Sequence, residues 1–90
     1  MLDLRYSKQF KKDFRLCLKC RYNMVLLQKV IDILRVPDVL PERNADHGLS
    51  GNHLGYRECH ILPDWLLIYR QEKGELLLYR TGTHADLFGK

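Results

Sequence analysis

The first third of the chain changes from strand-like to helix-like spacing of its apolar residues. Residues 2–6 alternate apolar and polar side chains, which is typical of a short strand. Ser7 follows as a good helix N-cap, and the large apolar residues then recur at every fourth position, as Phe10, Phe14 and Leu18. The pattern predicts a strand and then a helix that turns these three side chains toward the core.

A second helix is predicted over residues 24–36, with Asn23 as its N-cap. Its apolar stripe consists of Leu27, Val30, Ile31 and Leu34. Because only a short link separates the two helices, they should form an antiparallel hairpin whose apolar stripes cover the same face of a sheet. Pro37 and Pro41 end the second helix, and residues 44–52 are expected to form a loop.

The second half of the chain contains three apolar runs of strand length, at residues 56–61, 65–71 and 76–81. Pro63-Asp64 supplies a turn between the first two runs, and residues 72–75 supply a hairpin turn between the last two. The order of strand, two helices and three strands predicts one α+β domain over residues 1–90. In that domain the helix hairpin packs on one face of a largely antiparallel sheet.

Side-chain alternation assigns residues of these strands to the two faces of the sheet. It groups Tyr56, Glu58 and His60 on one face of their strand. In the last strand it groups Leu76, Leu78 and Arg80 against Leu77 and Tyr79. Since the helices can cover only one face, the other face is available for a functional site.

Basic residues outnumber acidic ones by 15 to 11, which gives a net charge of +4. Many of them lie on the first predicted helix, whose basic side is either an ordinary solvated surface or a patch that faces nucleic acid or an acidic protein. No apolar segment approaches the ~20 residues of a membrane span, and no signal peptide is recognisable at the start of the chain. We therefore expect a cytoplasmic protein that makes no membrane contact.

The three cysteines, Cys17, Cys20 and Cys59, do not form a recognised framework. Cys17 and Cys20 have C-x-x-C spacing, but they lie inside a predicted helix, and no second Cys/His pair follows at zinc-finger spacing. We expect reduced thiols, no metal site and no cofactor.

Four residues suited to proton transfer or anion binding fall at or just beyond the ends of the predicted strands: His60, Asp64, Arg80 and His84. Cleavage of RNA by its own 2′-hydroxyl requires such a set, because a base removes the 2′ proton, an acid protonates the leaving oxygen and a cation stabilises the phosphorane. Three of these residues also have a purely structural interpretation. His60 could simply end a strand, Asp64 could serve only the turn, and Arg80 could be a surface charge or a partner of Glu58.

Two motifs carry a resemblance to a known family. The first is Leu49-x-Gly51-x-x-x-Gly55-Tyr56-Arg57-x-x-His60-x-x-Pro63-Asp64-Trp65-x-Leu67-Ile68-Tyr69, and the second is Arg80-Thr81-Gly82-Thr83-His84-Ala85-x-Leu87-Phe88. Together they resemble the YafQ-type toxins of the RelE/ParE superfamily, while in the N-terminal half the likeness is limited to Tyr6-Ser7 and the helix hairpin. The resemblance implies a small RelE-like fold of order β-α-α-β-β-β and a toxin of a type II toxin–antitoxin module.

The same resemblance implies an activity and a set of partners. The toxin would be a ribosome-dependent endoribonuclease that enters the A site and cuts mRNA, leaving a cyclic phosphate. Its partners would be a cognate antitoxin, the ribosome and mRNA, with operator DNA contacted only through the antitoxin complex.

By position, the resemblance implies an active site made of His47, His60, Asp64, Arg80, His84 and Phe88. We expect His84 and Asp64 to flank the scissile phosphate as the proton-transfer pair, and Arg80 to bind that phosphate. His60 and His47 would position or polarise it, and Phe88 could stack on a base. His53 has no counterpart in the family pattern.

Two other classes of protein remain as alternatives. A ParE-like toxin poisons gyrase without cutting RNA, and the retained set of histidines disfavours it. A non-catalytic RNA- or protein-binding domain would explain the charge, but not the joint presence of His60, Asp64 and His84.

Overall fold

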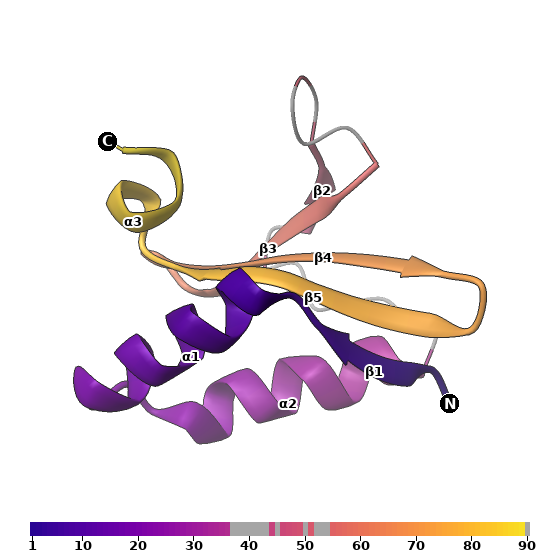
Figure 1. Ribbon diagram of the computed structural model, residues 1–90, viewed down its shortest axis with the longest axis horizontal. Helices are drawn as coiled ribbons and strands as arrows, with labels where there is room; N and C mark the ends of the chain where they lie inside the picture. The colour runs from indigo at the N-terminus through magenta and orange to yellow at the C-terminus, as the bar shows by residue number, and fades with distance from the viewer. Residues whose placement is uncertain (37–43, 45, 50, 52–54, 90) are drawn as a thin grey trace.

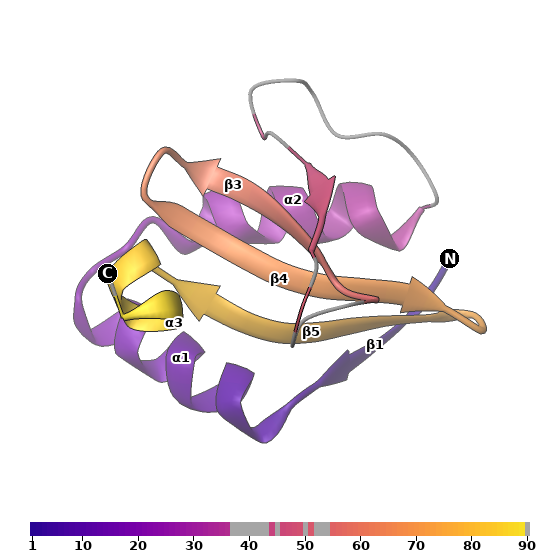
Figure 2. The ribbon, with the colours of Figure 1, turned by 90° about the horizontal axis from the view of Figure 1, so that it is seen from above.

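The computed structural model describes residues 1–36, 44, 46–49, 51 and 55–89. The elements are, in chain order, β1 (Asp3–Tyr6), α1 (Lys8–Lys19), α2 (Met24–Arg35), β2 (His47–Gly48), β3 (Arg57–Leu62), β4 (Trp65–Glu72), β5 (Glu75–Gly82) and α3 (His84–Phe88). One five-stranded sheet has the order β1-β5-β4-β3-β2, with β1 parallel to β5 and the other neighbours antiparallel. Figures 1 and 2 show α1 and α2 on the same side of this sheet. The predicted α+β fold is therefore confirmed.

The predicted helix caps and hairpin turn are also present. The Ser7 hydroxyl accepts a hydrogen bond from the Phe10 amide at 2.9 Å, and the Asn23 side chain accepts one from the Val25 amide at 3.2 Å. Lys73 and Gly74 join β4 to β5 with φ angles of 51° and 77°. A two-residue turn with both φ angles positive matches the twist of the strands that it connects.

Two elements were not predicted. β2 lies in the segment expected to be a loop, so that prediction is wrong at His47 and Gly48, which pair with β3. A two-residue strand has no periodicity of its own, because it exists only through its partner. α3 is also short, with five residues, and it begins with a capping box in which the Thr83 and Asp86 side chains each accept a hydrogen bond from the other residue's backbone amide. Pro37, Pro41 and His53 lie outside the residues that the structure describes.

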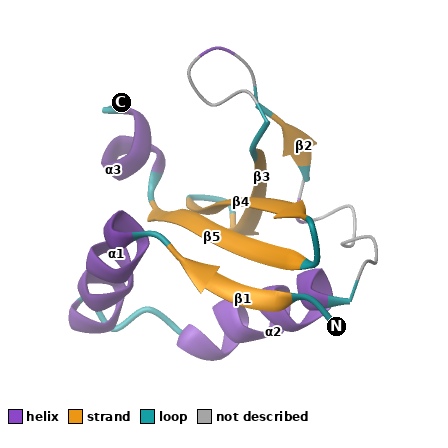
Figure 3. Cartoon of the chain, turned by 45° about the vertical axis from the view of Figure 1, so that its right-hand side comes forward, coloured by secondary structure: helices purple, strands orange, loops and turns teal. Residues whose placement is uncertain are grey.

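The core cluster consists of side chains from α1, α2, β3, β4 and β5. Figure 3 shows α1 and α2 beside one face of the sheet, and the core lies between these helices and that face. The predicted stripe of α2 is buried in full. On α1 the prediction is partly wrong, because Phe10 is buried and Phe14 half-buried, whereas Leu18 is 51% exposed and Cys17 is buried in its place. A four-residue step advances 400° around a helix, so two such steps carry Leu18 about 80° away from Phe10, while Cys17 returns to within about 20° of it.

A β-bulge changes which face Arg80 occupies. Ile68 pairs with Arg80, but the next residue, Tyr69, pairs with Leu78, so Tyr79 is an extra residue in β5. Directly paired residues share a face, and Tyr69 belongs to the core cluster whereas Ile68 does not. Arg80 therefore lies on the face opposite Leu78, which corrects the grouping expected from simple alternation.

Candidate active site

The face of the sheet opposite α1 and α2 carries the candidate site. α3 rises from one side of this face and β2 from the other (Figure 1). Leu66 and Ile68 of β4 are fully buried yet stand outside the core cluster, so they form an apolar floor on this face. The titratable side chains predicted from the sequence gather above and around that floor.

Asp64 and His84 meet at one end of this face. The Asp64 carboxylate lies 2.7 Å from Nδ1 of His84 and also accepts a hydrogen bond from the backbone amide of His84 at 3.1 Å. Because an ionised carboxylate can only accept, Nδ1 carries the proton in this contact and Nε2 points elsewhere. These bonds from the His84 side chain and backbone lower the pKa of the Asp64 carboxyl below its ordinary value. Asp64 is therefore a carboxylate at neutral pH.

Glu58 joins two further histidines. Its Oε1 lies 3.2 Å from Nε2 of His47 and 3.5 Å from Nε2 of His60, and its side chain is only 8% exposed. The ring centroids of His60 and His84 are 5.7 Å apart with an edge-to-face angle of 77°. Asp64, His84, His60, Glu58 and His47 therefore form an unbroken series of neighbours across this end of the sheet.

Local hydrogen bonds hold the histidines of β2 and β3 in place. The Asn44 side chain is buried and donates a hydrogen bond of 2.6 Å to the backbone carbonyl of His60. Nε of Arg57 donates to the Asp46 carboxylate at 3.0 Å, next to His47. These two contacts fasten the segment before β3 to β3 itself, so that His47 faces Glu58.

Arg80 is held by a helix on the other side of the sheet. Its Nε and one terminal nitrogen lie 2.7 Å and 3.2 Å from the two carboxylate oxygens of Asp13 in α1. Asp13 is buried and also accepts from the backbone amide of Thr81 at 3.2 Å. The hydrogen bonds to Asp13 raise the pKa of the Arg80 guanidinium above its ordinary value, so the cation is permanent.

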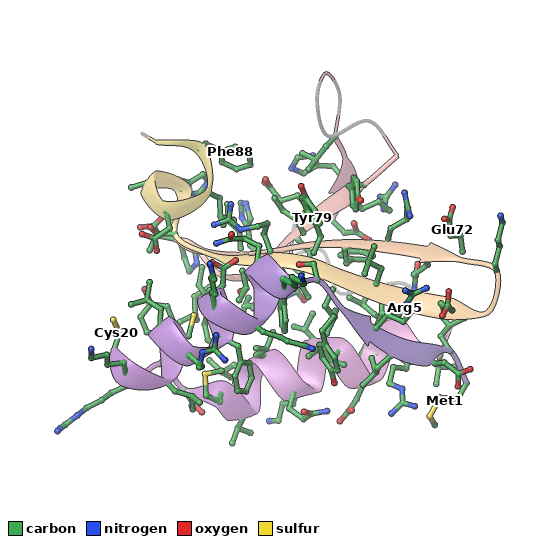
Figure 4. The ribbon with its side chains drawn as sticks, in the orientation of Figure 1. Met1, Arg5, Cys20, Glu72, Tyr79 and Phe88 are labelled. Atoms are coloured by element: carbon green, nitrogen blue, oxygen red, sulfur yellow. The ribbon has the colours of Figure 1, made fainter. Side chains whose placement is uncertain are left out.

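Register relates Arg80 to the histidines. His47, Glu58, Ile68 and Arg80 are consecutive partners across four strands. Neighbouring strands are about 4.8 Å apart, so the backbones of Glu58 and Arg80 are separated by about 10 Å. Phe88 is on α3, one helical turn after His84, and Figure 4 shows it extending on the same side of the sheet.

The structure thus brings together His47, His60, Asp64 and His84, places Arg80 on the same face and leaves Phe88 at the margin. Two residues were missed in these roles. Glu58 was expected on this face, but not as the common partner of two imidazoles. Asp13 forms an ion pair with Arg80, whereas the sequence indicated only that Arg80 could be a surface charge or a partner of Glu58. The available signal was that Asp13 is an acidic residue three positions after Phe10, inside an otherwise basic helix.

One cluster has the composition of a metal site. Ligand atoms of Glu58, His60 and His84 all lie within 4.8 Å of one another, close enough to coordinate one transition-metal ion. These three ligands come together only in the folded chain, and their spacing in the sequence does not predict a metal site. The cysteines lie elsewhere: burial raises the pKa of Cys17 to about 11 and of Cys59 to about 12, so both remain thiols at neutral pH.

The arrangement suits acid–base chemistry on an anionic substrate. Imidazoles transfer protons near neutral pH, two carboxylates orient them, and a fixed guanidinium can bind a phosphate at the side. No helix among the described residues is both long enough and apolar enough to cross a membrane.

Comparison with known proteins identifies the family of the chain. Residues 2–89 match the family described as the bacterial toxin of type II toxin–antitoxin system, YafQ. The mRNA interferase toxin YafQ of Escherichia coli K12 is 42% identical over 90 residues, which cover 97% of this chain and 96% of that protein. The chain also superposes on a copper-bound mutant toxin from Helicobacter pylori with a TM-score of 0.94 and 41% identity, over 98% of this chain and 100% of that chain. It superposes on a chain in the crystal structure of the E. coli DinJ–YafQ complex with a TM-score of 0.90 and 41% identity, over 99% of this chain and 100% of that chain. The chain therefore belongs to the YafQ family of toxins of bacterial type II toxin–antitoxin systems.

Proposed function

We propose that this toxin is an endoribonuclease that cuts mRNA in the ribosomal A site, in the cytoplasm, by attack of the neighbouring 2′-hydroxyl. The observation that carries the proposal is the series of contacts from Asp64 through His84 and His60 to Glu58, with Arg80 on the same face. Relatives that are similar over nearly their whole length are named mRNA interferase toxins, which supports the same activity.

His84 is proposed as a proton-transfer residue. Its Nδ1 is engaged by Asp64, so Nε2 is the nitrogen that faces substrate. A carboxylate with a lowered pKa is a poor proton donor at neutral pH, so Asp64 fits an orienting role better than that of an independent acid. Asp64 would fix the tautomer of His84 and stabilise the imidazolium that forms when Nε2 takes up a proton.

The second proton transfer is assigned to His60. Its ring is next to that of His84, and its Nε2 is 3.5 Å from the Glu58 carboxylate. Glu58 also contacts His47, so one buried carboxylate would stabilise positive charge on either ring. His47 would position Glu58 and attract the phosphate without exchanging a proton.

Arg80 is proposed to bind the scissile phosphate. Two of its nitrogens face Asp13, and the guanidinium has five N–H donors, so others are left to face an anion. Because Asp13 fixes the orientation of the guanidinium in advance, little rotational freedom is lost when phosphate binds. Phe88 would stack on a base at the margin of the site.

The partners are proposed by analogy with the family. The E. coli relative is crystallised with its antitoxin DinJ, and we expect a cognate antitoxin to silence this toxin in the same way. Operator DNA would be bound by that complex and not by the toxin alone.

Single-turnover cleavage on ribosomes programmed with a defined mRNA tests the mechanism. His84→Ala should slow cleavage by roughly 10²–10⁴, the usual share of a general acid or base. His53→Ala, at a position where the family pattern has no histidine, is the matched control. The upstream fragment should end in a 2′,3′-cyclic or 3′-phosphate, whereas hydrolysis by a metal-activated water would normally leave a 3′-hydroxyl.

A 2′-deoxynucleotide at the cut site separates this mechanism from the alternatives. It should abolish cleavage but preserve binding, because the phosphate proposed to contact Arg80 is unchanged. Cleavage of the deoxy substrate at the parent rate would refute the 2′-hydroxyl mechanism. Double-strand DNA breaks in cells with intact mRNA would instead indicate a gyrase poison, and growth arrest with neither lesion would indicate a binding domain.

A further inference from the structure

A second cluster of side chains lies beside the histidines. The rings of Tyr56 and Tyr79 are stacked, with centroids 4.5 Å apart and planes inclined by 29°. The guanidinium carbon of Arg70 lies 4.9 Å from the centroid of the Tyr56 ring. Both tyrosines and Arg70 are partly exposed. None of the three belongs to the hydrophobic core between the sheet and the helices.

The fold places this aromatic cluster, defined as Tyr56, Arg70 and Tyr79, directly next to the proposed catalytic groups. Tyr56 is two residues before Glu58, a separation of about 7 Å along a strand. Tyr79 is the bulged residue of β5 and immediately precedes Arg80. Figure 4 shows Tyr79 on the side of the sheet away from α1 and α2, where Phe88 also extends.

Arg70 adds a guanidinium group to the two stacked rings. One of its terminal nitrogens is 3.2 Å from Glu72, but its buried Nε has no hydrogen-bond partner among the residues that the structure describes. Its position over the Tyr56 ring is that of a cation–π contact. The result is a partly exposed stack of flat groups that contains one guanidinium, which is also paired with Glu72.

We propose that the aromatic cluster is a stacking platform for a nucleobase of the mRNA close to the cut. This inference rests on the proposed function, because it supplies the substrate contact for the same site. Aromatic side chains on an open sheet face bind single-stranded RNA by stacking on unpaired bases, and an arginine adds attraction for the negative backbone. With the scissile phosphate at Arg80, a neighbouring base reaches Tyr79 without leaving the sheet face.

Two measurements on programmed ribosomes test the platform. The first is the concentration of toxin that gives half-maximal single-turnover cleavage of an all-ribose mRNA. The second is the affinity for ribosomes that carry the uncleavable 2′-deoxy mRNA, which reports on binding even without catalysis. Tyr79→Ala should weaken both by roughly 5- to 150-fold, the range expected for one stacked base. The maximal cleavage rate should change much less.

Matched variants separate stacking from folding. Tyr79→Phe keeps the ring and should behave like the parent protein. Tyr79→Leu keeps apolar bulk without an aromatic face, so it should show the same defect as alanine with a near-parental melting temperature. Tyr6→Ala removes a tyrosine that is 47% exposed and stacks on Phe10 on the helix side of the sheet, and it should leave both measurements unchanged.

Abasic nucleotides identify what the platform binds. The base is removed in turn from the nucleotides adjacent to the cut and from the next one outward on each side. At one of these positions the penalty of Tyr79→Ala should disappear, because the missing base and the missing ring belong to the same contact. An equal penalty on every abasic mRNA would overturn the proposal in favour of a contact with ribosomal RNA or protein. No penalty on intact mRNA would also overturn it. If the parent toxin binds with this base dependence but never cleaves, the proposed nuclease function fails while the platform stands.

Discussion

Asp13 is the residue whose replacement gives the sharpest test of how the fold supports the site. It lies on α1, on the opposite side of the sheet from the imidazoles, and its carboxylate accepts from two nitrogens of Arg80 and from the backbone amide of Thr81. Asp13→Ala would remove all three acceptor contacts at once. It should reduce both the stability of the domain and the fixed orientation of Arg80.

The expected loss of stability follows from burial. Thr81 is 1% exposed, so its amide would be left buried without an acceptor, at a cost of about 1–3 kcal/mol. Arg80 has a side chain that is 23% exposed, so water can replace part of what it loses, and its contribution falls at the low end of about 1.5–3 kcal/mol. The total is about 3 kcal/mol, a large share of the 5–15 kcal/mol that stabilises a typical domain.

Thermal unfolding and single-turnover cleavage together measure the effect. For a domain of this size, 3 kcal/mol lowers the melting temperature by roughly 12–24 °C. Asp13→Asn keeps the shape of the side chain and one carbonyl acceptor, so its stability loss should be smaller. Asp32→Ala is the matched control, since Asp32 is an exposed helical aspartate whose one side-chain hydrogen bond within the described part of the chain is to Gln28, at 2.8 Å. This substitution should change stability by less than about 0.5 kcal/mol.

The cleavage rate adds a second criterion. At a temperature where Asp13→Ala is still folded, cleavage should be slower than in the parent, because the guanidinium no longer has a fixed orientation toward the phosphate. If Asp13→Ala melts within a degree or two of Asp32→Ala, the buried contact does not have the energy assigned to it. If it melts early but cleaves at the parent rate, Asp13 does not position Arg80 for catalysis.

Three further predictions concern other parts of the molecule. Phe10→Ala should destabilise the domain by about 3–5 kcal/mol and Leu18→Ala by less than about 0.5 kcal/mol, and equal losses in denaturant titrations would contradict the inward face assigned to α1. Carboxyl NMR should give Asp64 a pKa below its ordinary value, and His84→Ala should raise that pKa. Because the pKa of Asp64 is lower in the folded state than in the unfolded state, its contact with His84 stabilises the fold at pH values above the ordinary carboxyl range, and this stabilisation is lost as the pH falls through the folded-state pKa. An unchanged pKa of Asp64 in the variant would rule out the pairing. Reversing Lys11, Lys12 and Arg15 to Glu on the exposed side of α1 should weaken binding to the antitoxin or to ribosomes, more strongly at low salt, whereas equal affinities across a salt titration would exclude an electrostatic role for this helix.

Local interactions explain which structural predictions succeeded. Ser7 and Asn23 cap helices because their side chains bond amides two or three residues away, and Lys73-Gly74 turns because of its own φ angles. The stripe of α2 is equally local, since a period of 3.6 residues selects the same side chains in any context. These features required no knowledge of distant parts of the chain.

The site residues were predictable as a set but not as an arrangement. His60, Asp64, Arg80 and His84 stand at strand ends in the sequence, and the family motifs add His47 and Phe88. Nothing local could show that Glu58 joins His47 to His60, because that contact depends on β2, a strand of two residues that exists only beside β3.

The chain by itself determined the order of its longer helices and of strands β1, β3, β4 and β5, the helix caps at Ser7 and Asn23, the apolar stripe of α2 and the identity of the reactive side chains, because each depends on neighbours in sequence. Tertiary structure alone decided that a bulge at Tyr79 moves Arg80 to the open face, that Asp13 reaches Arg80 from 67 residues away, and that Glu58, His60 and His84 converge. The physical reason is that register, bulges and long-range ion pairs are settled by the packing of whole strands and helices. That packing energy is summed over the entire core and is not encoded in any one segment.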